Sequence, residues 1–318
     1  MTLMAMSKTP KRLYKYRAFS ALTVDLLVSD RLYFADPTTF NDPLDTKPVV
    51  TVDLPLEEVR QAVIALTKRR IHEEMSAAAK TIKHRSPRTR QHIDRLAQGK
   101  AQHVIAEIAD RATDPDQGDD AVENELWLLR HELQIELLKQ YDRGILSLAE
   151  RNSCPLMWSH YGEQHHGLCI GYAVPDPSPP GLYRVEYGGS RLVEASKVVR
   201  LLEGDPLARA EVDEAVLLRK ARDWRYEKEW RMIGQRGLAD CPLELNDLTF
   251  GLRCPDTVRA TVVKALEGRS KPVQFYEMRE VHGKFELKRY PLEIVELLMS
   301  YPRRAADALE GFDDVSAV

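Results

Sequence analysis

Residues 224–233 carry acidic, basic and aromatic side chains at a spacing that suits chemistry on a β-strand. Alternate residues of a strand point to the same side, so Glu227, Glu229 and Arg231 would share one face at intervals of about 7 Å. The opposite face would carry Tyr226, Lys228 and Trp230. Two of the chain's four tryptophans flank this row, and proteins generally bury tryptophan. A carboxylate row held against aromatic rings favours sugar or cofactor chemistry.

Three histidines fall within seven residues of a second segment: His160, His165 and His166. Imidazoles so close together can hold a metal ion, with Asp42 or Glu229 as an oxygen ligand. A second interpretation is that the histidines donate hydrogen bonds to backbone or substrate from a loop or helix start between strands. A third is that they are plain surface residues.

Two further segments carry possible binding groups. Residues 40–43 read Phe-Asn-Asp-Pro, a fixed turn in which Asn41 and Asp42 either cap their own backbone or point into a cleft. Arg17 ends an alternating segment, residues 13–17, that predicts a strand. Its guanidinium can grip a phosphate or carboxylate through two hydrogen bonds, or pair with an acid of residues 224–233.

Composition excludes several classes of protein. The 318 residues are 43% hydrophobic and 30% charged, as in ordinary globular proteins, and the net charge of -3 gives no global attraction to nucleic acid. No apolar run approaches the ~20 residues of a membrane span, and no secretion signal is expected. The four cysteines lack a Cys-x-x-Cys pair, so we expect reduced thiols and a cytoplasmic location. Phosphate-loop, dinucleotide-binding and Gly-x-Ser-x-Gly motifs do not occur.

The elements that must position these residues indicate an α+β domain with a helical insertion. Strands are expected at 13–17, 32–35, 145–148, 167–174, 183–187, 224–233, 273–278 and 285–290, and helices at 21–29, 205–222 and 258–266. The core would comprise residues 12–55 and 141–296, the helical insertion residues 56–140, and a C-terminal tail residues 297–318.

The insertion carries its charges in blocks. Residues 80–100 contain seven basic residues against Asp94, and residues 107–125 contain eight acids against Arg111. Residues 114–120, with Pro115 and Gly118, are expected to form a loop. One interpretation of the basic block is a solvated helix face that pairs partly with the acids. The other is a phosphate-binding surface for nucleic acid.

Four motifs occur in a fixed order along the chain. They are Leu-Tyr-Lys-Tyr-Arg at 13–17, Phe-Asn-Asp-Pro at 40–43, Met-Trp-Ser-His-Tyr-Gly at 157–162 followed by His166-Gly167, and Tyr-Glu-Lys-Glu-Trp-Arg at 226–231. Together with Leu-Tyr-Phe-Ala at 32–35, they resemble a bacterial family catalogued as a domain of unknown function. The resemblance covers about residues 12–295, with 56–140 as its variable part, and implies no activity by itself.

The order of these segments is also similar to that of ADP-ribosyltransferases. That resemblance implies an α+β core in which NAD lies in a cleft between two small antiparallel sheets. By position, Arg17 would hold the phosphates or ribose of NAD, and Ser159 or Tyr161 on a middle strand would support the nicotinamide. Glu229, assisted by Glu227, would face the same cleft and contact the nicotinamide ribose. The middle motif departs from a Ser-Thr-Ser pattern.

The sequence therefore predicts an NAD-dependent ADP-ribosyltransferase or NAD hydrolase, in the role of a toxin or phage-defence effector, with NAD as substrate and no metal. The candidate catalytic residues are Glu229 and Glu227; the candidate substrate-binding residues are Arg17, Tyr16, Asn41, Asp42, Trp158, Ser159, His160, Tyr161, His166 and Arg231. Two alternatives stay open: a metal-dependent nuclease or hydrolase using His160, His165 and Asp42, and a nucleic-acid- or protein-binding module working through basic helices at 68–103. The acceptor and the oligomeric state also stay open.

Overall fold

The computed structural model describes residues 9–81, 86–114, 116, 120–141 and 143–303. Within these residues the chain forms two compact units. The sheet unit comprises residues 9–36, 144–185 and 223–303, and the helical unit comprises the described part of residues 37–143 and 186–222. The sequence predicts residues 37–55 and 186–222 as parts of the core, whereas the structure groups both with the helices.

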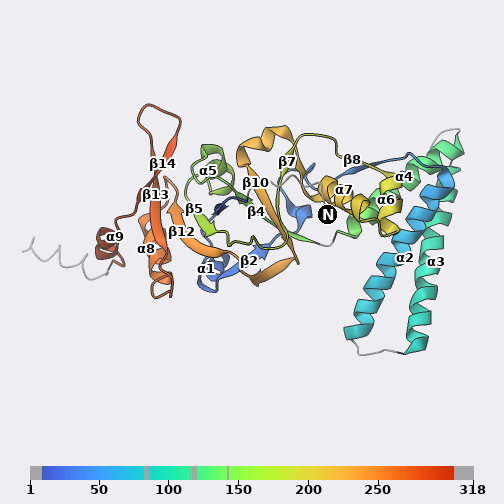
Figure 1. The fold of residues 1–318 in the computed structure, drawn as a ribbon, viewed down its shortest axis with the longest axis horizontal. Helices are drawn as coiled ribbons and strands as arrows, with labels where there is room; N and C mark the ends of the chain where they lie inside the picture. Colours follow the sequence, from blue (N-terminus) through green and yellow to red (C-terminus); the bar gives the residue numbers. More distant parts are fainter. Residues whose placement is uncertain (1–8, 82–85, 115, 117–119, 142, 304–318) are drawn as a thin grey trace, which may run out of the picture. The chain divides into compact units, whose positions relative to one another are not determined.

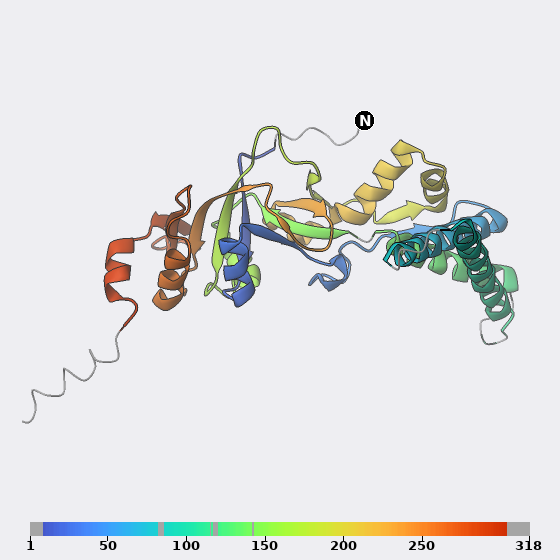
Figure 2. The same ribbon diagram turned by 90° about the horizontal axis from the view of Figure 1, so that it is seen from below.

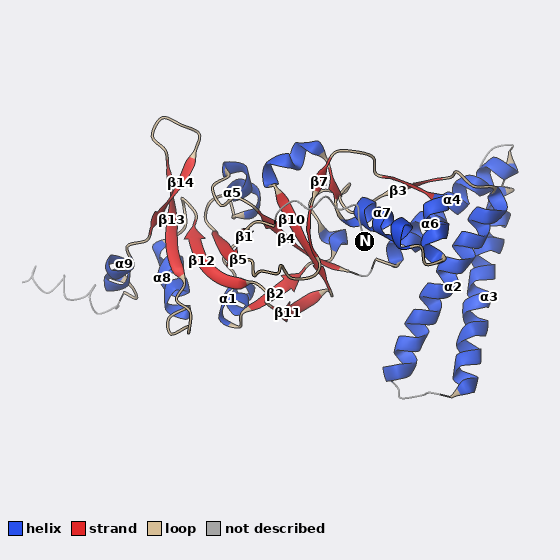
Figure 3. Ribbon diagram, in the orientation of Figure 1, coloured by secondary structure: helices blue, strands red, loops and turns tan. Residues whose placement is uncertain are grey.

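An eight-stranded mixed sheet dominates the sheet unit (Figures 1 and 3). Its strand order is β14-β13-β12-β5-β1-β4-β10-β6. The strands are β1 (Arg12–Arg17), β4 (Gly144–Ala149), β5 (Leu168–Ala173), β6 (Leu182–Arg184), β10 (Glu229–Gly234), β12 (Glu244–Phe250), β13 (Gln274–Glu280) and β14 (Leu287–Pro291). Among the described strands of this sheet, β12 and β13 pair in parallel and the other neighbours are antiparallel. The expected core of two small antiparallel sheets is therefore not what the structure shows. The chain does combine helices and strands as expected.

One face of this sheet holds the main core, because alternate strand residues on that side are apolar. Leu13 of β1, Leu148 of β4 and Trp230 of β10 belong to this buried cluster. It also includes residues from three helices: α1 (Ala21–Val28), α8 (Asp256–Ala265) and α9 (Ile294–Ser300). A small two-stranded sheet, β2 (Arg31–Phe34) with β11 (Gly237–Asp240), contributes Phe34.

The other face of the sheet carries α5 (Pro155–Tyr161) and a smaller buried cluster around Tyr16, Trp158 and Cys169. Pro155 opens α5 at a position where proline is favoured, and the helix ends before Gly162. The resemblance to ADP-ribosyltransferases implies a strand-borne middle motif at Ser159 and Tyr161, and this expectation is wrong because both residues lie in a helix. Helical spacing places residues three or four apart side by side, instead of alternating them between two faces.

The expected strand at 224–233 begins later than the sequence predicts. Residues 222–227 form a 3₁₀ turn, η3 (Arg222–Glu227), and Lys228 takes a left-handed conformation with φ 46° before β10 starts at Glu229. Glu227 is therefore not on a common strand face with Glu229 and Arg231. The expected aromatic face is also divided, because Trp230 joins the main core while Tyr226 packs with the smaller cluster.

The helical unit is built on three long helices: α2 (Leu56–Thr81), α3 (Pro87–Ala112) and α4 (Ala121–Lys139). Figure 2 shows α2 and α3 lying side by side, seen nearly along their axes. The unit also contains α6 (Ala195–Leu202), α7 (Pro206–Leu217), and the strand pairs β3 (Val49–Thr51) with β8 (Leu192–Glu194) and β7 (Glu186–Tyr187) with β9 (Arg219–Lys220). This confirms the helical character of residues 56–140. Part of the expected loop at 114–120 and residues 304–318 of the expected tail lie outside the described residues.

None of the described helices combines the length and apolar character needed to cross a bilayer.

Candidate functional site

Arg17 and Glu229 lie on opposite faces of the large sheet. Residues that pair across antiparallel strands share a face, and Ala149 pairs with both Tyr14 and Glu229. Arg17 follows Tyr14 by three positions in the same strand, so its side chain points to the other face. Burial lowers the pKa of the Arg17 guanidinium, and the nearby Tyr172 and Tyr33 act against this effect. The expectation that Arg17 and Glu229 face one cleft is therefore wrong.

Glu229 and Arg231 form a buried ion pair on β10. Arg231 Nε lies 2.9 Å from Glu229 Oε1, and a terminal guanidinium nitrogen lies 3.2 Å from Oε2. The two side chains are 0% (Arg231) and 4% (Glu229) exposed. Their positions two apart on one strand bring both to the same face, as the sequence predicts. Much of the charge of Glu229 is thus compensated by its neighbour.

Tyr161 and Glu227 meet beside this ion pair. The Tyr161 hydroxyl, at the last residue of α5, donates a 2.8 Å hydrogen bond to Glu227 Oε1 at the end of η3. Burial raises the pKa of Tyr161, and the negative charges of Glu227 and Glu229 raise it further. Tyr161 therefore stays a proton donor at neutral pH, and the structure brings four of the predicted site residues together.

Aromatic rings gather around His160 next to this hydrogen bond. The His160 ring lies 6.2 Å from the Tyr161 ring, 6.1 Å from Trp224 and 6.3 Å from Tyr226, centroid to centroid. Trp224 and Tyr226 are themselves 6.0 Å apart. His160 is exposed, and Trp224 and Tyr226 are half-buried. The aromatic cluster, as we name these four residues, offers rings that can stack on a planar group.

Tyr16 and Trp158, both predicted to bind substrate, are buried packing residues. Their rings meet edge to face at 5.1 Å, and their exposed fractions are 4% and 0%. The Tyr16 hydroxyl donates to the carbonyl of Arg151 at 2.8 Å, and Trp158 Nε1 donates to the carbonyl of Asn152 at 2.8 Å. These bonds secure α5 and the loop before it against the sheet.

A left-handed turn that includes His165 follows α5. Its residues Glu163, Gln164 and His165 have φ values of 51°, 52° and 72°. The His165 ring stacks on Trp158 at 6.3 Å, and burial lowers its pKa. The exposed Ser159 and His166 lie beside the turn: Ser159 Oγ is 3.3 Å from His165 Nε2, and His166 Nδ1 is 3.1 Å from the carbonyl of Glu163.

Asn41 and Asp42 belong to the helical unit. Asp42 Oδ1 accepts a 2.8 Å hydrogen bond from the amide of Leu44, and its carbonyl accepts from the amide of Asp45 at 3.1 Å. This is the self-capped turn that the sequence offers as one of two interpretations. Asn41 is exposed.

Asp247, which the sequence analysis missed, is a second buried carboxylate on the face of the sheet that carries Glu229. It is 0% exposed and accepts hydrogen bonds from Arg289 at 2.7 Å and Arg12 at 3.2 Å. Gly171 lies against it, since a Cβ there would come within 2.4 Å of Asp247 Oδ1. A glycine inside a strand often marks such a close approach, so Gly171 carried the signal that could have found this group.

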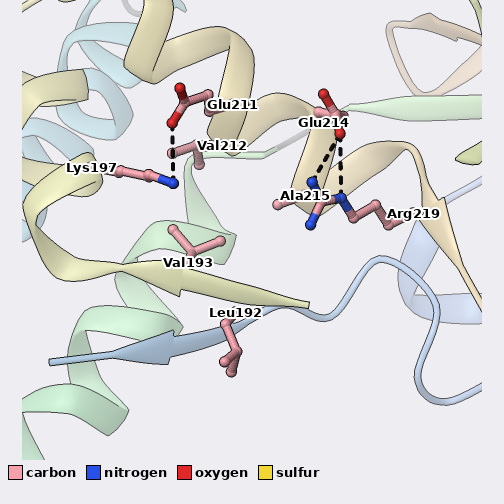
Figure 4. A pocket seen from close by; sticks show the side chains of 8 residues that line it. All are labelled: Leu192, Val193, Lys197, Glu211, Val212, Glu214, Ala215 and Arg219. Carbon is pink, nitrogen blue, oxygen red and sulfur yellow. Dashed lines mark hydrogen bonds and ion pairs between the residues drawn. The ribbon is translucent and has the colours of Figure 1, made fainter. Parts of the chain in front are cut away.

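A small cavity of about 150 Å³ occurs in the helical unit (Figure 4). Its charged lining is paired, with Lys197 Nζ 3.2 Å from Glu211 and Arg219 3.0 Å from Glu214. The remaining lining residues are Leu192, Val193, Val212 and Ala215. None of the residues predicted from the sequence lines this cavity.

Among the residues that the structure describes, no group of three or more His, Cys, Asp or Glu side chains is placed to hold a metal ion. In comparisons with known proteins, no family model, curated protein or solved structure matches this chain. The candidate site therefore rests on the Tyr161–Glu227 hydrogen bond, the Glu229–Arg231 ion pair and the aromatic cluster.

Proposed function

We propose that the sheet unit cleaves the bond between nicotinamide and ribose in NAD, as an ADP-ribosyltransferase or NAD hydrolase. The observation that carries the proposal is the hydrogen bond from Tyr161 to Glu227 beside the aromatic cluster. A carboxylate can stabilise the oxocarbenium-like transition state of glycosidic bond cleavage, and the neighbouring aromatic rings can stack on the planar nicotinamide. Arg17 has no part in this proposal, because it lies on the other face of the sheet.

In the reaction, the bond between nicotinamide N1 and ribose C1′ breaks, and nicotinamide leaves with the bonding electron pair as a neutral molecule. The positive charge that develops on C1′ and the ring oxygen is stabilised by the Glu227 carboxylate. Water or an acceptor nucleophile then bonds to C1′, and the Glu227 carboxylate accepts the proton that it releases. Tyr161 keeps Glu227 oriented, and the Glu229–Arg231 pair fixes the start of β10 beneath it.

The test is release of nicotinamide from NAD, followed by chromatography, for the wild type and three variants. Glu227→Gln removes the charge and should lower the rate by about 100-fold. Tyr161→Phe removes only the orienting hydrogen bond and should lower it by about tenfold. Asp223→Asn, an exposed acid of the same 3₁₀ turn, is the matched control and should leave the rate within about twofold.

Circular dichroism and thermal unfolding check that each variant folds. The proposal is overturned if the folded wild type releases no nicotinamide in water or with a mixture of protein and nucleic-acid acceptors. It is equally overturned if Glu227→Gln retains the wild-type rate.

A further inference from the structure

Helices α2 and α3 form a long antiparallel hairpin whose far end lies beyond the packed part of the helical unit (Figures 1 and 3). Each helix has 26 residues, which corresponds to about 39 Å. The buried residues of α2 lie between Val59 and Thr67, and none of residues 68–81 is buried. We call residues 68–81 and 86–103 the hairpin end.

The hairpin end is strongly basic. It contains eight Lys and Arg residues and three Asp and Glu residues. Arg69 and Arg70 pair with acids, and Asp94 lies 3.4 Å from His72. Five exposed basic residues, which we call the hairpin cations, form no ion pair within the described residues: Lys80, Arg88, Arg90, Arg95 and Lys100. The acids present on the hairpin end therefore leave most of its positive charge uncompensated.

Helix stability does not explain where these cations lie. Arg88 and Arg90 occupy the first turn of α3, which contains no acid. The positive end of the helix dipole lies there, so cations at these positions are unfavourable for the isolated helix. Arg95 lies seven residues after Arg88 on the same helix face, about 10 Å along the axis. By contrast, Arg70 binds the buried Glu136 at 2.8 Å and fixes α2 to α4.

We propose that the hairpin end binds the phosphate backbone of a nucleic acid. Uncompensated cations spread around an exposed pair of helices match the dense negative charge of phosphates, and such contacts do not depend on base sequence. The inference goes beyond the proposed NAD chemistry and does not rest on it. DNA and RNA offer the same phosphates, so the experiment uses both.

The test measures fluorescence anisotropy of a labelled DNA duplex and a labelled single-stranded RNA with the full-length protein at several salt concentrations. The triple variant Arg88→Gln/Arg90→Gln/Arg95→Gln should bind at least tenfold more weakly. For the duplex, the slope of log K against log salt concentration should become less steep by about 2 to 3. Each lost phosphate contact removes about 0.9 from that slope. Glutamine keeps helix propensity close to that of arginine, so the helices should be retained.

The matched control is Lys264→Gln/Lys271→Gln/Lys284→Gln, which removes three exposed positive charges from the sheet unit. It should bind like the wild type. The proposal is overturned if neither nucleic acid binds at low salt, or if both triple variants lose affinity equally. Binding to vesicles of anionic phospholipid without binding to either nucleic acid would also overturn it, and would point to a membrane surface instead.

Discussion

At the residue scale, the buried ion pair between Glu229 and Arg231 makes both positions sensitive to substitution. Both charges lie out of water, so the loss of either one removes charge compensation from the other. Arg231 binds the carboxylate through two nitrogens, a geometry that lysine cannot reproduce. Because this pair is buried, we expect a substitution at Glu229 to lower the stability of the fold, whatever its effect on catalysis.

We expect Glu229→Gln to lower the free energy of unfolding by about 3 kcal/mol, because it removes a buried negative charge that compensates the Arg231 guanidinium. Arg231→Lys should also destabilise the protein. Urea unfolding followed by circular dichroism measures both changes. Glu73→Gln, which breaks the exposed pair with Arg69, is the control and should change stability by less than about 0.5 kcal/mol. Equal effects of Glu229→Gln and Glu73→Gln on the free energy of unfolding would show that burial does not determine how much the Glu229–Arg231 pair stabilises the protein.

At the element scale, two glycines inside regular elements differ in the space that their surroundings leave for a side chain. The two glycines Gly171 in β5 and Gly99 in α3 show this contrast. An added Cβ at Gly171 meets the Asp247 carboxylate at 2.4 Å, whereas at Gly99 nothing lies within 4 Å. Substitution of each glycine should therefore change stability in opposite directions.

Gly171→Ala should lower the free energy of unfolding by about 1–3 kcal/mol, because the buried Asp247 and its arginine partners must shift. Gly99→Ala should raise it by about 0.5–1 kcal/mol, because alanine is the better helix former at an unobstructed position. Chemical denaturation of the two variants beside the wild type measures both. Stabilisation by Gly171→Ala would contradict the close approach of β5 to Asp247.

At the scale of the whole molecule, tyrosines in both units couple the fold to alkaline pH. Burial raises the pKa of Tyr16, Tyr161 and Tyr172 in the sheet unit. In the helical unit, burial and then Asp213 raise the pKa of Tyr141, whose hydroxyl donates to Asp213 at 2.7 Å. The unfolded chain releases these protons near pH 10, while the folded chain retains them.

This stabilising contribution is therefore complete below about pH 10 and is lost as the pH rises above it. We expect the melting temperature to fall steeply above pH 10. Absorbance of tyrosinate should show that these buried tyrosines titrate only as circular dichroism is lost. Tyr161→Phe should reduce the alkaline loss of stability. Reversible titration of every tyrosine near pH 10 with the fold intact would contradict this prediction.

The sequence predicted individual strands and helices better than it predicted how they pair and pack together. Alternation in residues 13–17 placed β1 correctly, and the Glu229–Arg231 spacing placed both residues on one face. Alternation could not show that Arg17 faces away from Glu229, because that depends on how β1, β4 and β10 pair in register. It also could not reveal the left-handed Lys228, which separates Glu227 from the strand.

The turn at residues 163–165 anchors the C-terminal end of α5. The carbonyl of His165 accepts from the amide of Arg253, and Gly251 leaves just enough room for that carbonyl. At its last residue, α5 is also held by the bond from Tyr161 to Glu227. The C-terminal end of α5, anchored in this way, is already ordered before any ligand binds. Binding there would cost little ordering entropy, and hydrogen exchange of α5 would change only slightly on saturation.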